Sequence, residues 1–193
     1  MKGIGKLTAF LIPVGIAVNA VGGQIALLLK LPIWLDGIGT ILIGGICGLV
    51  PGLIVAAITQ IINAISLPTV LPYMVVGFAM AVMGTYFSKR GFFLSLQKAV
   101  LLGILVAVVT TVMSVPIDVI LFGGFMGDGN SLLAAGLMTM GLSIPVAVAV
   151  SSFTFGLVDK TLSVLVCYFI IKSMPLNFLA KLPMSEYIIP PRK

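Results

Sequence analysis

Length, composition and charge already place this chain in a membrane. Of its 193 residues, 60% are hydrophobic and 8% are charged, whereas a soluble domain usually has about 25% charged residues. The formal charge of +6 does not indicate a nucleic-acid surface, because the basic residues cluster between apolar runs. The sequence contains no histidine, which excludes Ser-His-Asp, Cys-His and His-based metal chemistry and therefore most hydrolases.

Apolar runs predict six helices, because a helix that crosses a bilayer core of about 30 Å needs about 20 apolar residues. The run from Leu7 to Leu29 has 23 residues, longer than a signal-peptide core of about 7–15, so we expect a retained span. A long charge-free run from 37 to 88 is interrupted at Pro51-Gly52 and again between 66 and 72, which divides it into three helices. The predicted helices are 7–29, 35–50, 52–66, 72–88, 97–121 and 146–172.

The distribution of basic residues gives an independent test of this topology. With six spans, the N-terminus, the 88–98 loop and the C-terminus share one side, which then holds nine of the 11 basic residues. Lys30 lies on the opposite side, and Lys160 lies within the last apolar region. The positive-inside rule therefore places both termini in the cytoplasm. A seventh span through 132–151 would put the basic C-terminus outside, so we expect 123–145 to be an external loop or a re-entrant segment.

These patterns predict one domain over 1–193, an all-α integral membrane protein that forms a compact bundle of six transmembrane helices. Residues 173–193 alternate apolar and basic side chains, which is typical of a cytoplasmic tail lying at the membrane interface. Cys47 and Cys167 sit inside apolar runs, so we expect them to pack as small hydrophobic residues. No cysteine spacing in the sequence indicates a disulfide framework or a metal site.

Few polar side chains interrupt the apolar helices, so each of them is a candidate for function. Gln60 and Asn63 are three residues apart and therefore share a helix face, while Asp36 precedes the second helix and Asp118 follows Pro116 near the end of the fifth. On the predicted topology these groups lie in the outer half of the membrane, where they could line one pocket. Two alternatives stay open: amides and hydroxyls also join helices, and Asp36 could cap a helix end.

Asp159 and Lys160 are the only charged pair within the last apolar run. Adjacent residues point about 100° apart on a helix, so we expect that the two side chains do not face each other. Each is expected to pair with another helix, or the two mark a polar seam. A structural role is favoured over contact with a ligand.

Small residues recur at the four-residue spacing that lets two helix backbones approach closely. The two sets are Gly44, Gly48 and Gly52, and Ala9, Pro13 and Ala17. Such repeats also arise from packing within a glycine-rich protein, and that alternative stays open. The Gly-Ile-Gly-Thr sequence at 37–40 is not a nucleotide-binding fingerprint, because no strand precedes it and its third glycine is misplaced.

One part of the chain resembles a known family. Residues 31–40, Leu-Pro-Ile-Trp-Leu-Asp-Gly-Ile-Gly-Thr, are followed by a Gly- and Pro-containing helical turn and then by Gln60-Ile-Ile-Asn63. This pattern resembles the substrate-binding S components of energy-coupling factor (ECF) vitamin transporters, a class of ABC importers. The resemblance covers essentially the whole chain in length, six-span layout and charge pattern.

The resemblance implies a role in uptake across a bacterial plasma membrane. In that family a six-helix protein binds a vitamin or vitamin precursor from outside, associates with a transmembrane coupling subunit and two ATPase subunits, and topples to release the substrate inward. This sequence has no Gly-x4-Gly-Lys-Ser/Thr motif, so we expect ATP hydrolysis in the partners and no enzymatic activity in this chain. Ala9, Pro13 and Ala17 approximate the family's Ala-x-x-x-Ala docking motif, with the proline as a departure.

The resemblance and the polar residues together select the expected substrate contacts, with neither a cofactor nor nucleic acid involved. These are Trp34, which would stack or pack, and Asp36, Gln60, Asn63 and Asn130, which would form hydrogen bonds. Pantothenate is the first candidate ligand, followed by cobalamin, hydroxymethylpyrimidine or pyridoxine, and the acidic outer side disfavours a multiply anionic substrate. The alternative function is a stand-alone secondary transporter or channel, although the sequence shows no convincing twofold repeat.

Overall fold

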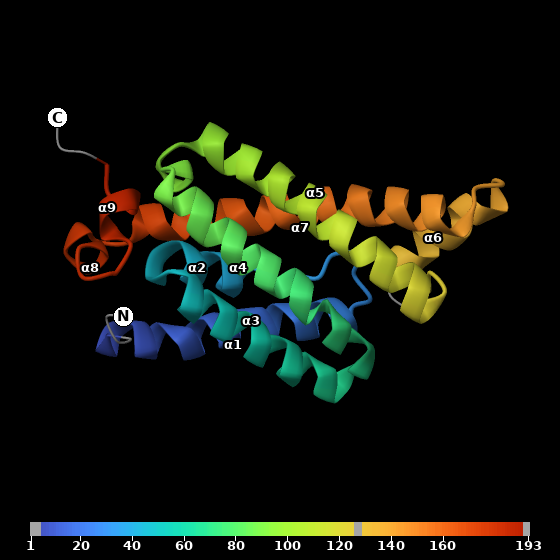
Figure 1. Ribbon diagram of the computed structural model, residues 1–193, viewed down its shortest axis with the longest axis horizontal. Coiled ribbons are helices and arrows are strands. Elements are labelled where there is room, and N and C mark those ends of the chain that lie inside the picture. The colour runs from blue at the N-terminus through green and yellow to red at the C-terminus, as the bar shows by residue number, and fades with distance from the viewer. Residues whose placement is uncertain (1–4, 126–128, 191–193) are drawn as a thin grey trace.

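Long apolar helices make up most of the chain. The computed structural model describes residues 5–125 and 129–190, and these contain α-helices and two short 3-10 helices but no strand. Figure 1 shows the helices packed lengthwise into an elongated bundle. In chain order they are α1 (Lys6–Leu28), α2 (Ile38–Cys47), α3 (Leu49–Ser66), η1 (Pro68–Tyr73), α4 (Met74–Lys89), η2 (Phe92–Leu94), α5 (Leu96–Phe122), α6 (Gly129–Thr139), α7 (Ile144–Ser173), α8 (Leu176–Leu179) and α9 (Ser185–Ile188).

Five helical segments in the described part of the chain are long and apolar enough to cross a membrane. They are α1, α3, the continuous η1–α4 segment, α5 and α7. The chain therefore has the character of an α-helical membrane protein, as its composition predicted. A helix occurs at each of the six predicted positions, with ends within three residues of the predicted bounds.

Helix α2 is the exception in length, and it has a different role from the others. Its 10 residues extend about 15 Å, half the thickness of a bilayer core. Every residue from Gly39 to Cys47 is buried, and the helix packs against α1, α3, α4 and α7. Helix α2 is thus the centre of the bundle, and the helices around it are the ones with exposed apolar side chains.

Glycines allow this central helix to approach its neighbours. A Cβ atom added to Gly39 would lie 2.0 Å from the Gly15 carbonyl oxygen of α1, so only glycine fits there. A Cβ atom on Gly52 would lie 2.9 Å from the Cα atom of Gly44, and one on Gly44 would lie 3.0 Å from the Ala81 carbonyl oxygen. Gly44 and Gly52 therefore serve internal packing of α2, α3 and α4, whereas Gly48 between them has open space and a φ of +100°.

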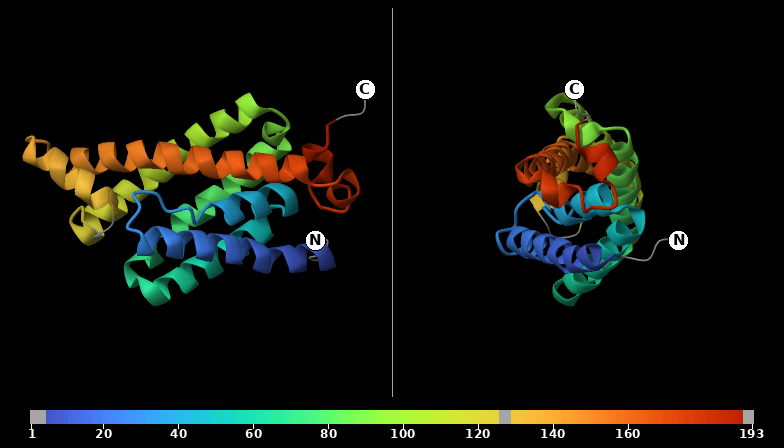
Figure 2. Two further views of the ribbon diagram at one scale, coloured as in Figure 1. Left: turned by 180° about the vertical axis from the view of Figure 1, so that it is seen from behind. Right: turned by 90° about the vertical axis from the view of Figure 1, so that its left-hand side faces the viewer.

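The two ends of the bundle differ in charge. The start of α1, the α4–α5 connection and the α8–α9 segment lie at one end, whereas the 29–37 loop, η1 and α6 lie at the other (Figures 1 and 2). The first end carries Lys6, Lys89, Arg90, Lys98, Lys172 and Lys181, and the second carries Lys30. The predicted grouping is therefore found for the start of α1, the 88–98 loop and the described part of the tail, while Lys2, Arg192 and Lys193 lie outside the described residues.

Two segments outside the main helices are more ordered than their composition indicated. Within 123–145, predicted as an external loop or re-entrant segment, α6 forms an 11-residue helix that packs against α7. In the tail, Leu179 and Ile188 are buried, and the Met184 amide donates a hydrogen bond of 3.2 Å to the Ile46 carbonyl of α2. The predicted interfacial tail thus packs against the end of α2, because its apolar side chains have a protein surface to cover.

Candidate functional site

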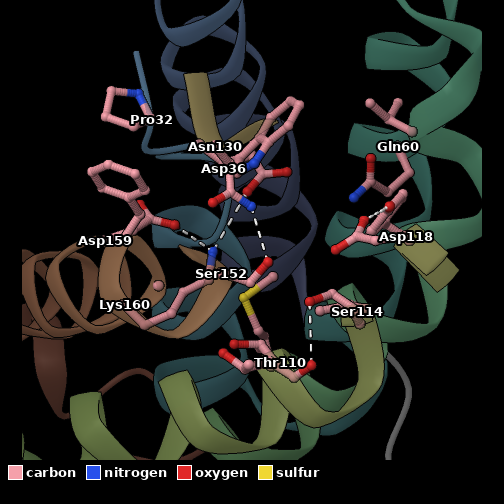
Figure 3. Close-up of a pocket in the computed structure, with 18 residues that line it drawn as sticks. Pro32, Asp36, Gln60, Thr110, Ser114, Asp118, Asn130, Ser152, Asp159 and Lys160 are labelled. Carbon is pink, nitrogen blue, oxygen red and sulfur yellow. Dashed lines mark hydrogen bonds and ion pairs between the residues drawn. The ribbon is translucent and has the colours of Figure 1, made fainter. Parts of the chain in front are cut away.

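A cavity of about 110 Å³ lies in the half of the bundle that holds the 29–37 loop, η1 and α6. It has room for several water molecules or for part of a small organic molecule. Figure 3 shows polar side chains facing this cavity from several helices. Its lining residues are Pro32, Trp34, Asp36, Gln60, Val70, Tyr73, Val76, Met80, Thr110, Thr111, Ser114, Asp118, Asn130, Ser152, Phe155, Gly156, Asp159 and Lys160.

Four of the five predicted contact residues line this cavity. Trp34 and Asp36 come from the loop before α2, Gln60 from α3 and Asn130 from α6. Asn63 does not line it, although it is only three residues from Gln60. Three residues advance a helix by about 300°, which turns Asn63 roughly 60° away from Gln60 and toward Gly23 of α1. The Asn63 amide is packed against α1 and does not line the cavity, so its contact with a substrate stays a prediction.

One wall of the cavity carries a buried ion cluster. The ammonium of Lys160 lies 2.6 Å from the Asp159 carboxylate and 3.9 Å from the Asp36 carboxylate. The expectation that Asp159 and Lys160 do not face each other was wrong, because the flexible four-carbon stem of lysine lets its ammonium fold back to the neighbouring residue. Lys160 also pairs with a second segment, but that partner is Asp36 in the 29–37 loop and not a residue of another helix.

The ion cluster also holds the loop that carries Trp34 and Asp36. Helix α1 ends before Lys30, whose φ of +48° is left-handed, and Pro32 cannot continue the helix. Leu35 is also left-handed, with a φ of +53°, a conformation that a branched side chain rarely adopts. Its amide donates a hydrogen bond of 3.1 Å to the Asp159 carboxylate, so α7 stabilises this loop conformation through the same residue that pairs with Lys160.

The opposite wall is built by α3, η1 and α5. The Tyr73 hydroxyl donates a hydrogen bond to the Asp118 carboxylate, and the Tyr73 ring is stacked on Phe122 at a centroid distance of 6.3 Å. Gln60 lies on the same wall (Figure 3). Its side chain is buried, and its Oε1 atom has no hydrogen-bond partner in the described structure. This wall therefore offers a carboxylate and an unsatisfied carbonyl oxygen.

The amide of Asn130 is already used between helices. Its Nδ2 atom donates a hydrogen bond of 2.9 Å to the Ser152 hydroxyl, while the Ser151 hydroxyl donates to its side-chain and main-chain oxygens. Asn130 therefore joins α6 to α7 at the edge of the cavity. Asn19 has the same kind of role: it donates to Thr40 at 2.9 Å and accepts from the Gly39 amide at 2.6 Å, which ties α1 to α2.

Sequence reasoning passed over several cavity residues. Asp159 and Lys160 were expected to be structural, yet they face the cavity as well as each other. Asp118 was recognised as a polar group in an apolar helix but was not selected, and its partner Tyr73 carried no signal in the sequence. A charged residue inside an apolar span is a functional candidate by default, and that rule alone selects Asp118, Asp159 and Lys160.

The acidic side chains of the cavity do not converge on one point. Within residues 5–125 and 129–190, no three His, Cys, Asp or Glu side chains come close enough together to hold a metal ion. The three carboxylates that line the cavity are divided between two walls, with Asp36 and Asp159 on one and Asp118 on the other. A search of protein-family models, curated protein sequences and solved structures finds no match to this chain.

Proposed function

We propose that this chain is the substrate-binding S component of an ECF-type importer, which captures a vitamin or vitamin precursor from outside a bacterial cell. The observation that carries this proposal is a cavity with buried polar and aromatic walls inside a bundle whose outer surface is apolar. Ligand sites are typically concave and largely apolar, with a few convergent polar groups. Four of the five residues selected through the family resemblance line this cavity, which supports the same role.

The proposed topology has six crossings with both termini in the cytoplasm. Five segments have sufficient length, and α2 would complete the sixth crossing together with the 29–37 loop. The end with six described basic residues would face the cytoplasm, because cytoplasmic ends of spans are enriched in lysine and arginine. The cavity lies toward the opposite end and would therefore be loaded from outside.

The proposed partners are a transmembrane coupling subunit and two ATPase subunits. Ala9, Pro13 and Ala17 are exposed along one strip of α1, where a second helix could approach the backbone closely. Larger exposed side chains flank the strip, among them Phe10 and Val14. The small exposed side chains on α1 would thus allow close approach of a helix of the coupling subunit.

The partner prediction is tested by isolating the tagged full-length chain from its native membrane in mild detergent. Native mass spectrometry is expected to show one coupling subunit and two ATPase subunits, the latter identified by Gly-x4-Gly-Lys-Ser/Thr motifs. Ala17→Trp should remove these partners, because a bulky side chain at this exposed position would keep a second helix away from α1. Val112→Trp is the matched control, since it places the same bulk on an exposed position of α5.

The outcomes distinguish the rival functions. Loss of the partners in Ala17→Trp but not in Val112→Trp supports docking through α1. A chain that binds its ligand but is always isolated without ATPase subunits would contradict the importer and favour a stand-alone transporter. A chain that conducts ions in planar bilayers without binding a ligand would favour a channel.

A further inference from the structure

We propose that the cavity takes a small organic ligand that carries a positively charged nitrogen and no net negative charge, an inference that rests on the proposed function. Such compounds are the class of substrate that the site would select. Charge, hydrogen-bonding capacity and aromatic surface in the lining of the cavity each point to this class.

The first observation is the charge of the lining. Among the described lining residues, Asp36, Asp118 and Asp159 are acidic and Lys160 is basic, a formal excess of two negative charges. Lys160 lies within 3.9 Å of both Asp36 and Asp159, so its charge is shared between two carboxylates. A site whose lining has a net excess of one sign of charge, with low-dielectric walls, concentrates ligands of the opposite sign. The cavity therefore favours cations and disfavours anions.

The second observation is independent of charge. Gln60 is 95% buried, since only 5% of its surface is exposed, and its Oε1 atom has no hydrogen-bond partner in the described structure. A buried carbonyl oxygen without a hydrogen-bond donor is unfavourable, so a ligand that supplies a donor there gains affinity. Gln60 faces the cavity from the wall that holds Asp118 (Figure 3). An N–H group placed there would satisfy the amide oxygen and lie near a carboxylate.

The third observation is the aromatic surface. Trp34, Tyr73 and Phe155 line the cavity from the 29–37 loop, η1 and α7. The faces of aromatic rings attract cations, with tryptophan the strongest, and they also stack on flat heterocycles. A protonated amine or a cationic heterocycle meets both features, and its positive charge would lie between the two acidic walls.

Two other ligand classes fit less well. A bare metal ion would need several oxygen ligands around one point, and the described residues hold no group of three acidic side chains close enough for that. An anion would bring further negative charge to a lining that already has an excess of it. Pantothenate, the first candidate from the sequence, carries a carboxylate and is therefore disfavoured.

The experiment uses the full-length chain purified in detergent. The chain is incubated with an equimolar mixture of small metabolites in three classes of equal number: compounds with a cationic nitrogen and no net negative charge, uncharged compounds, and anions. After removal of free compounds, the molecules retained by the protein are identified by mass spectrometry. We expect retention from the first class.

Variants then assign the selectivity to the cavity. Asp36→Asn and Asp118→Asn keep the size and oxygen of each side chain but remove a charge, so affinity for the retained compound should fall at least ~10-fold in each. Glu186→Gln is the matched control, because it makes the same acid-to-amide change at an exposed position on α9. The retention experiment itself uses the unmodified chain, so its result stands even if a variant fails to fold.

Each outcome has a defined meaning. Retention of a cationic compound, with weaker binding in the two cavity variants and unchanged binding in the control, supports the inference. Retention of an uncharged or anionic compound overturns the charge assignment and leaves the substrate-binding function in place. Retention of no compound from any class overturns both.

Discussion

Replacing Lys160 with methionine tests whether the buried ion cluster stabilises the fold. Methionine keeps the length of the side chain and its apolar stem but removes the ammonium that lies 2.6 Å from Asp159 and 3.9 Å from Asp36. Two carboxylates would then remain in the bundle without their shared cation. Of the two polar links described above between α7 and the 29–37 loop, the hydrogen bond from the Leu35 amide to Asp159 would remain.

The expected effect follows from the burial of the three charges. The side chains of Lys160, Asp159 and Asp36 are exposed by 9%, 3% and 12%, so water screens their interaction only weakly. Removing one partner from a buried ion pair costs about 3–5 kcal/mol, mostly because a desolvated charge is left uncompensated. We expect a loss of stability in this range. Adding Asp159→Asn to Lys160→Met should recover part of it, since the second change removes one of the two stranded charges.

Stability can be followed through Trp34, the single tryptophan of the chain, which lies in the cavity itself. Equilibrium unfolding in mixed detergent, monitored by its fluorescence and by far-ultraviolet circular dichroism, gives the free energy of unfolding for each variant. Lys172→Met is the matched control, because Lys172 is exposed in the last turn of the same helix. If Lys160→Met were as stable as Lys172→Met, the reasoning from buried charge would be refuted.

Three further predictions concern packing inside the bundle. Gly39→Ala should prevent folding or strongly destabilise the protein, because its Cβ atom would lie 2.0 Å from a carbonyl oxygen of α1. Gly136→Ala, on the open face of α6, is the control and should be tolerated. The yield of monodisperse protein in detergent compares the two variants. Asn19→Ala should lower the free energy of unfolding by about 1–2 kcal/mol, since it removes several interhelical hydrogen bonds of about 0.6 kcal/mol each. The same unfolding assay measures this difference, and an unchanged free energy would contradict the prediction. Both cysteines, Cys47 and Cys167, are buried, so a maleimide should label them only after unfolding. Labelling is followed by mass spectrometry. Rapid labelling of the folded chain would contradict the packing.

The candidate site was predictable where a polar residue stood out from an apolar background. Trp34, Asp36, Gln60 and Asn130 were selected from such residues together with the family resemblance, and all four line the cavity. Asn63 met the same criterion but lies off the cavity, because the exact rotation of α3 depends on how α1 packs against it. Spacing along a helix identifies which residues are neighbours, and it does not identify which face the neighbouring helices cover.

Length, hydropathy and the positions of charges are properties of the sequence itself, and they were sufficient to predict helices at the six observed positions and the gathering of basic residues at one end. These features depend on local composition, because the bilayer acts as a solvent on each segment separately. The contacts that build the cavity walls are different: Leu35 and Asp159 are 124 positions apart, and Tyr73 and Asp118 are 45 apart. The packing of α5 against α7, and of α7 against the central α2, brings these groups to one cavity. Side-chain contact between distant segments is decided by tertiary structure and not by local pattern.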